Sequence, residues 1–186
     1  MNVIPRPVAV FASSRRNGNT GQLMDRIAQE LGIEVIDLAR KNISPYDYEH
    51  RNRKDDFEPL MEYLFRFNQW IFASPVYWYS VSPPMKVFLD RISDYLDVPD
   101  LLDKGRRLRE KWAYVVCTSV YEEVPAPFIG AFRETFSYLG MHFGGLAHAN
   151  CRDGYSANEY DRDVEAFIRS IKTPRTQRSI PEEPHA

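Results

Sequence analysis

A short apolar run that ends in a polar, basic turn constrains the fold of this chain most. Residues Val8–Ala12 are all apolar, which is typical of a strand buried on both faces of a parallel sheet. The turn, residues 13–20 (SSRRNGNT), leads into a helical stripe of Leu23, Met24, Ile27 and Leu31. We expect Thr20 to cap this helix and Gly32 to end it.

The same alternation of strand-like and helix-like segments continues along the chain. Strands are expected at 8–12, 33–38 (nearer an edge), 70–74, 112–117 and 141–149. Apolar stripes predict helices in the intervals between them, one of which starts at Ser82 and runs to Leu96. Ser156 and Glu159 form a capping-box pattern before a last helix that ends near Ile171. A polar loop is expected over 39–55 and a charged connection over 98–111.

This βα alternation predicts an α/β fold in which a five-stranded parallel sheet has helices on both faces. One domain is expected over residues 1–172, followed by a polar, disordered tail over 173–186. Ligands of such sheets bind at the carboxyl ends of the strands. The loops after the first, third and fourth strands are therefore the places to look for a site.

Composition narrows the class of protein. The net charge of −2 offers no electrostatic support for a nucleic-acid partner. No apolar run is long enough to cross a membrane, and the N-terminus does not resemble a signal peptide. Cys117 and Cys151 show no metal-binding spacing, so a reduced, cytoplasmic chain is expected. No metal site is predicted, and His50, His142, His148 and His185 are interpreted as structural.

The first loop has the composition of an anion site. Ser13, Ser14 and Thr20 supply hydroxyl donors, and Arg15 and Arg16 supply positive charge. The loop precedes a helix N-terminus, where unpaired N–H groups and the helix dipole favour a phosphate. The alternative is a solvated turn with a good helix cap. Neither a GxxxxGK[ST] nor a GxGxxG pattern is present.

The second loop, residues 74–82 (SPVYWYSVS), carries three consecutive aromatic side chains. They cannot all face the core from the end of one strand, so at least one points into a cleft or at a partner chain. A planar ligand would stack on them or abut them. A dimer interface is the alternative interpretation.

Together the two loops resemble a known family. SSRRNGNT is similar to the GSxRxxGNT phosphate loop of flavodoxin-like NAD(P)H-dependent FMN reductases, with Ala12 where glycine is usual. SPVYWYSVSPPMKVFLDR resembles the PxYWYSxSxxxKxFxDR flavin segment of the same family. The resemblance implies a three-layer flavodoxin-like fold that holds FMN without a covalent bond. Lys86 and Asp90 of this segment are one helical turn apart and are expected to form a structural ion pair.

The resemblance also implies the site residues. The FMN phosphate would be held by Ser13, Arg15, Gly18, Asn19 and Thr20. The isoalloxazine ring would be lined by Pro75, Val76, Tyr77, Trp78, Tyr79 and Ser80. Thr118 and Ser119, followed by Val120 and Tyr121, would lie on the other side of the ring. This third loop departs from the family pattern, because Glu122, Glu123 and Pro125 stand where glycines are common.

The function implied is an oxidoreductase that passes hydride from NAD(P)H through FMN to a small acceptor. Quinones, azo and nitro compounds, flavins and metal chelates all remain open as acceptors. No catalytic side chain is expected, because the flavin performs the chemistry. A flavodoxin-like electron carrier and a non-enzymatic flavin-binding protein are the alternatives. The resemblance further implies a homodimer or a higher homo-oligomer.

Overall fold

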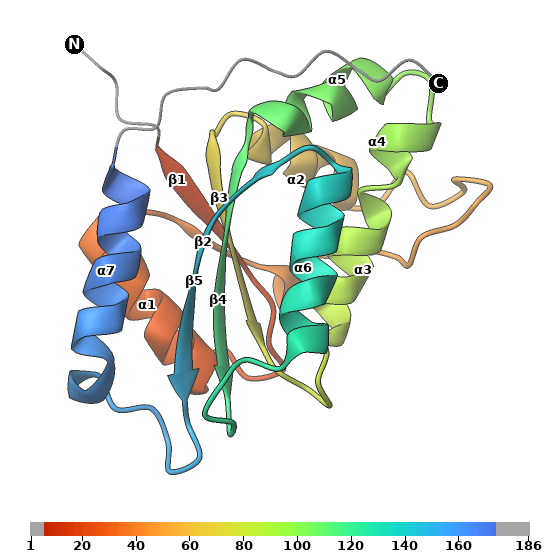
Figure 1. Ribbon diagram of the computed structural model, residues 1–186. Coiled ribbons are helices and arrows are strands. Elements are labelled where there is room, and N and C mark those ends of the chain that lie inside the picture. Colours follow the sequence, from red (N-terminus) through yellow and green to blue (C-terminus); the bar gives the residue numbers. More distant parts are fainter. Residues whose placement is uncertain (1–5, 174–186) are drawn as a thin grey trace.

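Five parallel strands form one sheet in the order β2-β1-β3-β4-β5 in the computed structural model, which describes residues 6–173 (Figure 1). The strands are β1 (Pro7–Phe11), β2 (Val35–Asp37), β3 (Gln69–Pro75), β4 (Trp112–Ser119) and β5 (His142–Asn150). The chain reverses direction across the sheet between β1 and β3. This order is the flavodoxin-like one, and its ligand crevice lies at that switch point. The predicted fold class is confirmed.

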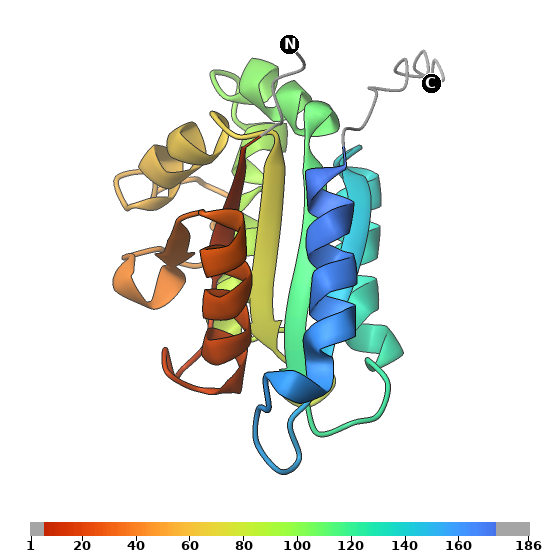
Figure 2. The same ribbon diagram turned by 90° about the vertical axis from the view of Figure 1, so that its left-hand side faces the viewer.

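Helices cover both faces of the sheet (Figures 1 and 2). One face carries α1 (Asn19–Leu31) and α7 (Asp161–Lys172), and the other carries α2 (Phe57–Leu64), α3 (Pro83–Arg91) and α6 (Ala126–Tyr138). Alternate residues of β1 belong to the two resulting cores, with Val8 and Val10 in one and Ala9 and Phe11 in the other. The uniformly apolar run that predicted this strand follows from burial on both faces.

The structure agrees in part with the predictions for α1 and β2. The helix starts at Asn19 with Gly18 as N-cap, so the expectation that Thr20 caps it is wrong by two residues. Gly32 ends it in the left-handed conformation, with φ of 63°, as predicted. β2 is one of the two edge strands, as expected, but it is shorter than expected because Leu38–Arg40 turns into a 3-10 helix.

The helix predicted from Ser82 to Leu96 is broken in two. α3 ends at Arg91, and α4 (Asp94–Asp97) follows. The amides of Ile92 and Ser93 bond the carbonyl groups three residues back, which tightens and ends the helix. Leu96 is 38% exposed and does not continue the buried stripe.

Two further expectations about helix boundaries are wrong. The connection over 98–111 contains α5 (Leu102–Arg106) and a 3-10 helix over Arg107–Glu110, both at the amino end of the sheet (Figure 1). The Ser156–Glu159 capping box does not form. Instead a 3-10 turn over Asn158–Tyr160 leads into α7, and the hydroxyl of Tyr160, its N-cap residue, donates to the Asn150 carbonyl.

Arg91 is fully buried and joins the loop before α2 to the end of α3. Its guanidinium contacts the Asp55 carboxylate at 2.5 Å and the Asp94 carboxylate at 2.8 Å. It also lies 4.6 Å from the centroid of the Phe57 ring. The predicted Lys86–Asp90 ion pair forms at 2.6 Å on the exposed face of the helix. Both contacts are structural.

No helix within residues 6–173 has the length and apolarity of a membrane span. Of the tail predicted over 173–186, Thr173 follows α7, and its amide bonds the Arg169 carbonyl. The remainder of that predicted tail, residues 174–186, lies outside the described part of the chain.

Candidate functional site

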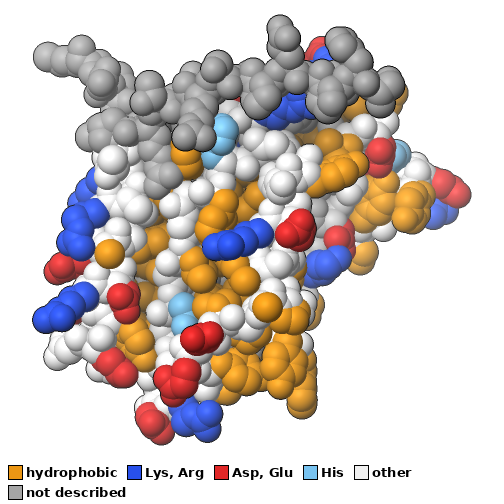
Figure 3. All heavy atoms as spheres, viewed as in Figure 1, with side chains coloured by type: hydrophobic (Ala, Val, Ile, Leu, Met, Phe, Trp, Pro, Cys, Tyr) orange, Lys and Arg blue, Asp and Glu red, His pale blue; other side chains and the backbone are white. Residues whose placement is uncertain are grey.

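A cavity of about 810 Å³ lies at the carboxyl edge of the sheet, beside the switch point between β1 and β3. The three loops expected to carry the site line it, together with one residue after β5. Its volume lies within the roughly 300–1,000 Å³ typical of small-molecule sites. Figure 3 shows apolar side chains gathered below α6, where the β3–α3 and β4–α6 loops lie.

The first loop presents its N–H groups to the cavity at the start of α1. Gly18, the N-cap, has no side chain that could accept a hydrogen bond from the first-turn amides, so these amides remain available for a ligand. The Ser13 hydroxyl is buried and accepts the Arg15 amide at 3.3 Å, which curls the loop. Arg15 is the one charged side chain among the described lining residues, so the cavity favours an anion.

Close packing holds this loop against the helix. A Cβ on Gly21 would lie 1.8 Å from the Arg16 carbonyl oxygen, so only glycine permits this approach. The Arg16 side chain does not line the cavity. It forms an ion pair with Asp25 and lies 5.0 Å from the centroid of the Phe11 ring.

The second loop contains a strained turn. Tyr77 and Ser80 exchange two backbone hydrogen bonds of 2.9 Å, and the residues between them, Trp78 and Tyr79, have φ of 46° and 63°. Positive φ at both central residues defines a type I′ turn, which bulky side chains rarely adopt. The turn leaves Trp78 92% exposed at the cavity. Such strain is typical of functional loops.

Three side-chain contacts join the loops in pairs. The Ser14 and Tyr77 hydroxyls lie 2.8 Å apart and connect the first loop to the second. The Thr20 and Thr118 hydroxyls lie 2.6 Å apart and connect the first to the third. The rings of Tyr79 and Tyr121 stack, with centroids 5.4 Å apart, and connect the second to the third. Each pair of loops around the cavity is therefore joined by a direct side-chain contact.

The pKa of the Tyr77 phenol reflects the electrostatic environment that the first loop creates. Burial opposes ionisation of the phenol, but hydrogen bonds with Ser14 and Ser13 and the charge of Arg15 outweigh it and lower the pKa of Tyr77. The loop therefore stabilises negative charge, as a phosphate site requires.

The structure brings most of the predicted site residues together. Of those residues, Ser13, Arg15, Gly18, Asn19, Thr20, Pro75, Val76, Tyr77, Trp78, Thr118 and Ser119 line the cavity. Tyr79 and Ser80 do not; Tyr79 packs on Tyr121, and Ser80 closes the turn. Sequence reasoning missed Val81, Pro83 and Cys151, which also line it. Cys151 follows β5, and the signal that could have found it is its place just after the fifth predicted strand, whose carboxyl end lies at the same edge of the sheet as those of β3 and β4.

The residues present fit FMN. A helix N-terminus with free amides, hydroxyls and one arginine suits a phosphate, and the aromatic loops beside it suit a flat ring. Among residues 6–173, His, Cys, Asp and Glu side chains form no group of three suited to a metal ion.

Similarity to solved structures defines the class of protein. The fold matches the Trp repressor binding protein from Bacillus subtilis with a TM-score of 0.71 and 25% identity, covering 91% of this chain and 99% of that one. It also matches an FMN-dependent NADH-azoreductase from Bacillus anthracis, solved in complex with FMN, with a TM-score of 0.67 over 89% of this chain and 97% of that one. At 9% identity the second likeness concerns the fold alone. The protein is a flavodoxin-like α/β protein.

The sequence matches give the family. Residues 5–152 match the model of the NADPH-dependent FMN reductase family, to which this chain belongs. A Bacillus subtilis protein named as an NAD(P)H-dependent FMN-containing oxidoreductase, YwqN, is 32% identical over 146 residues, covering 73% of this chain and 80% of the relative. FMN and NAD(P)H are therefore the cofactors of this chain, and the predicted family is confirmed.

Proposed function

We propose that this chain oxidises NAD(P)H and passes the hydride, through FMN held in the cavity, to a small quinone-type acceptor. The observation that carries the proposal is the pairwise joining of the three loops by Ser14–Tyr77, Thr20–Thr118 and Tyr79–Tyr121. These contacts bring the basic, hydroxyl-rich first loop and the aromatic second loop to one cavity of about 810 Å³, which supports the proposal.

Each loop has a part in this proposal. Bound FMN supplies the hydride chemistry. Ser13, Arg15, Gly18, Asn19 and Thr20 hold its phosphate with amides, hydroxyls and one positive charge. Pro75, Val76, Tyr77 and Trp78 line one side of the ring, with Tyr79 and Ser80 fixing their turn, and Thr118 and Ser119 line the other.

An aromatic acceptor suits the mouth of this cavity. Trp78 is 92% exposed beside it, and the Tyr79–Tyr121 stack forms an aromatic edge. Flat, electron-poor rings such as quinones stack on such surfaces at little conformational cost. Azo and nitro compounds share this shape and are the next candidates.

The deciding experiment is an anaerobic spectrum of the purified protein loaded with FMN. NAD(P)H should bleach the flavin band, and benzoquinone should then restore it. A flavin band that NAD(P)H leaves unchanged would instead indicate an electron carrier. A protein that neither holds nor takes up FMN would contradict both.

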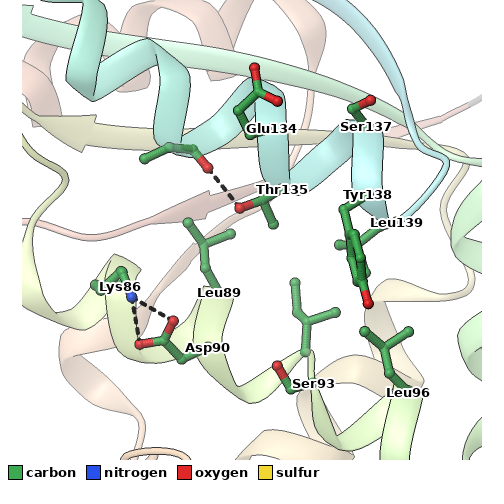
Figure 4. A pocket seen from close by; sticks show the side chains of 12 residues that line it. Lys86, Leu89, Asp90, Ser93, Leu96, Glu134, Thr135, Ser137, Tyr138 and Leu139 are labelled. Carbon is green, nitrogen blue, oxygen red and sulfur yellow. Dashed lines mark hydrogen bonds and ion pairs between the residues drawn. The ribbon is translucent and has the colours of Figure 1, made fainter.

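The second large hollow favours a homodimer rather than a second substrate. It measures about 610 Å³ and lies between α3, α4 and α6, away from the strand ends (Figure 4). Leu89, Leu96 and Tyr138 line it, and Tyr138 is 82% exposed. Lys86 and Asp90 on its α3 wall and Glu134 on its α6 wall add charge around these apolar side chains, a combination that resembles the apolar centre and polar rim of a protein–protein interface. Sedimentation of wild type and Tyr138→Glu tests this assembly, and a monomeric wild type would contradict it.

The two cysteines support a cytoplasmic location for the protein. Both Cys117 and Cys151 are free thiols, as expected of a reducing compartment. A fluorescent fusion imaged in the source cell tests this placement.

A further inference from the structure

One wall of the FMN cavity separates it from a second, polar pocket. Ser119, the last residue of β4, lines the cavity, and His148 of β5 lines a pocket of about 400 Å³ on the other side. The Ser119 hydroxyl oxygen lies 2.8 Å from Nε2 of His148. This hydrogen bond is the link between the two spaces.

The Ser119 hydroxyl lies between Tyr121 and His148. Its Oγ accepts the Tyr121 amide at 3.1 Å and can donate to the Tyr121 carbonyl at 3.4 Å, contacts that hold the third loop against the strand end. A hydroxyl has one proton and two lone pairs, so Oγ can still donate to Nε2 or accept from it. Nδ1 of His148 bonds no described residue, and the ring lines the polar pocket.

We propose that Ser119 and His148 form a proton relay between the polar pocket and the acceptor bound in the FMN cavity. The inference rests on the proposed function and deepens it, because it assigns the source of a proton that the reaction consumes. Ser119 touches the cavity and is the catalytic group, and His148, which acts through it, is a positioning and relay residue.

The chemistry of the acceptor requires this proton. Reduction of a quinone by NAD(P)H takes one hydride from the nucleotide and one proton from solution. In the relay, the O–H bond of Ser119 breaks and its proton bonds the acceptor oxygen, while an N–H bond of the protonated His148 breaks and that proton replaces the one on Oγ, which leaves a neutral imidazole. The imidazole then recovers a proton from solvent in the polar pocket, and neither residue is changed overall.

The polar pocket supplies the charged surroundings of His148. Charged and polar side chains from four segments line this pocket with the ring. They are Glu122 of the β4–α6 loop, Arg152 and Asp153 after β5, Glu159 and Tyr160 in the turn before α7, and Asp163 of α7. Burial lowers the pKa of His148, and the charge of Glu122 opposes that shift. The imidazole therefore holds its proton less readily than an exposed histidine does, and a falling pH raises the fraction that carries one.

Stopped-flow measurement of the two half-reactions tests the relay. Delivery of hydride by NAD(P)H needs no proton from solution, so His148→Gln should bleach the flavin band within twofold of the wild-type rate. Reoxidation by benzoquinone does need one, and it should slow by roughly 100-fold. It should also lose the acceleration that the wild type shows as the pH falls through the His148 pKa.

Two further variants separate the relay from a folding defect. Ser119→Ala keeps the imidazole but removes the hydroxyl, and it should slow the benzoquinone step to the same degree. His142→Gln is the matched control, since His142 stacks on Trp112 at the opposite end of β5 and should leave both half-reactions unchanged.

A second readout does not depend on activity. In the full-length protein, NMR titration of the imidazole signals should show the pKa of His148 altered by Ser119→Ala and the signals of His142 unmoved. An unaltered His148 titration, or wild-type benzoquinone rates in His148→Gln, would overturn the relay alone. Failure of NAD(P)H to bleach the flavin band would overturn the proposed function and the relay with it.

Discussion

The Thr20 and Thr118 hydroxyls lie 2.6 Å apart and join the first turn of α1 to the end of β4. The two residues are far apart in sequence, and β3 lies between β4, which carries Thr118, and β1, which precedes the loop leading to Thr20. The contact is buried, so it fixes the distance between the first loop and the third loop. Contacts between the loops themselves therefore fix their positions, which lowers the free energy that ligand binding must spend on ordering them.

Removal of the one cavity charge should weaken FMN binding selectively. A hydrogen bond to a charged group contributes about 1.5–3 kcal/mol, so Arg15→Ala should raise the FMN dissociation constant roughly 10- to 100-fold. Riboflavin, which lacks the phosphate, should bind the variant and the wild type equally. Fluorescence titration of the apoprotein measures both ligands.

Arg16→Ala is the matched control for this prediction. Arg16 neighbours Arg15, but it pairs with Asp25 outside the cavity, so FMN affinity should stay within about twofold of wild type. Equal losses in the two variants would mean that the loop acts through its general charge, not through Arg15.

A methyl group at Gly21 should displace the first loop, residues 13–20. Its Cβ would meet the Arg16 carbonyl oxygen at 1.8 Å, and a backbone atom cannot move aside as a flexible side chain does. Gly21→Ala should therefore cost about 1–3 kcal/mol of unfolding free energy. It should also weaken FMN binding by roughly 10-fold or more, as measured by urea denaturation and by FMN titration.

Gly130 of α6 provides the comparison for Gly21. A Cβ there has no heavy atom within 4 Å, so Gly130→Ala should stabilise the helix by about 0.5–1 kcal/mol and leave FMN affinity unchanged. A Gly21→Ala variant that binds FMN as tightly as wild type would show that the loop does not depend on this close approach.

The parts of the fold that sequence reasoning predicted are those set by periodicity and by strand ends. Val8–Phe11 is apolar on both sides because both faces of β1 are covered. The carboxyl ends of parallel strands share one edge, so loops that follow β1, β3 and β4 had to meet. That argument placed most of the site without knowledge of any tertiary contact.

The parts that sequence reasoning missed depend on tertiary contacts or on very short elements. α5 has five residues and is too short for a periodic stripe, but the buried Leu101 and Leu108 anchor it and the turn after it. Tyr79 turns from the cavity because the type I′ geometry reverses the chain at Trp78. His148 reaches Ser119 only through the pairing of β4 with β5, which no spacing along the chain reveals.

Loss of the buried cation at the end of α3 should destabilise the protein strongly. Arg91→Met leaves the Asp55 and Asp94 carboxylates buried without their partner, which should cost about 3–5 kcal/mol of unfolding free energy in urea denaturation. Lys86→Met removes an exposed ion pair from the same helix and should cost at most about 0.5 kcal/mol. Similar losses in the two variants would contradict the importance of burial.

The Arg91–Asp55 ion pair should make the stability of the protein depend on pH in a defined direction. Burial raises the pKa of Asp55, but hydrogen bonds from Arg91 and from the Ser44 and Phe57 amides outweigh it, so the net shift is downward. A carboxyl whose pKa is lower in the folded state contributes stability above its unfolded value of about 3.9, and that stability is lost as the pH falls below it. Acid denaturation should show this loss in the wild type and a weaker one in Arg91→Met.

The two cysteines should resist alkylation in the folded protein. Burial raises the pKa of Cys151 to about 11, with a further contribution from Glu159, and burial also raises the pKa of Cys117. At pH 8 only about one Cys151 in a thousand is then a thiolate, the reactive form. Labelling by iodoacetamide, followed by mass spectrometry, should be slow at pH 8 and rise about tenfold for each unit of pH up to 10.

The position of Cys151 makes this labelling a probe of the site. Cys151 lines the cavity, whereas Cys117 lies within β4 with no exposed surface, so bound FMN should protect Cys151 further and leave Cys117 unlabelled with or without ligand. Riboflavin should protect Cys151 as FMN does if the ring lies beside it, and inorganic phosphate alone should not. Rapid labelling of Cys151 at pH 8, or the same rate with FMN bound, would place the ligand elsewhere than between the three loops.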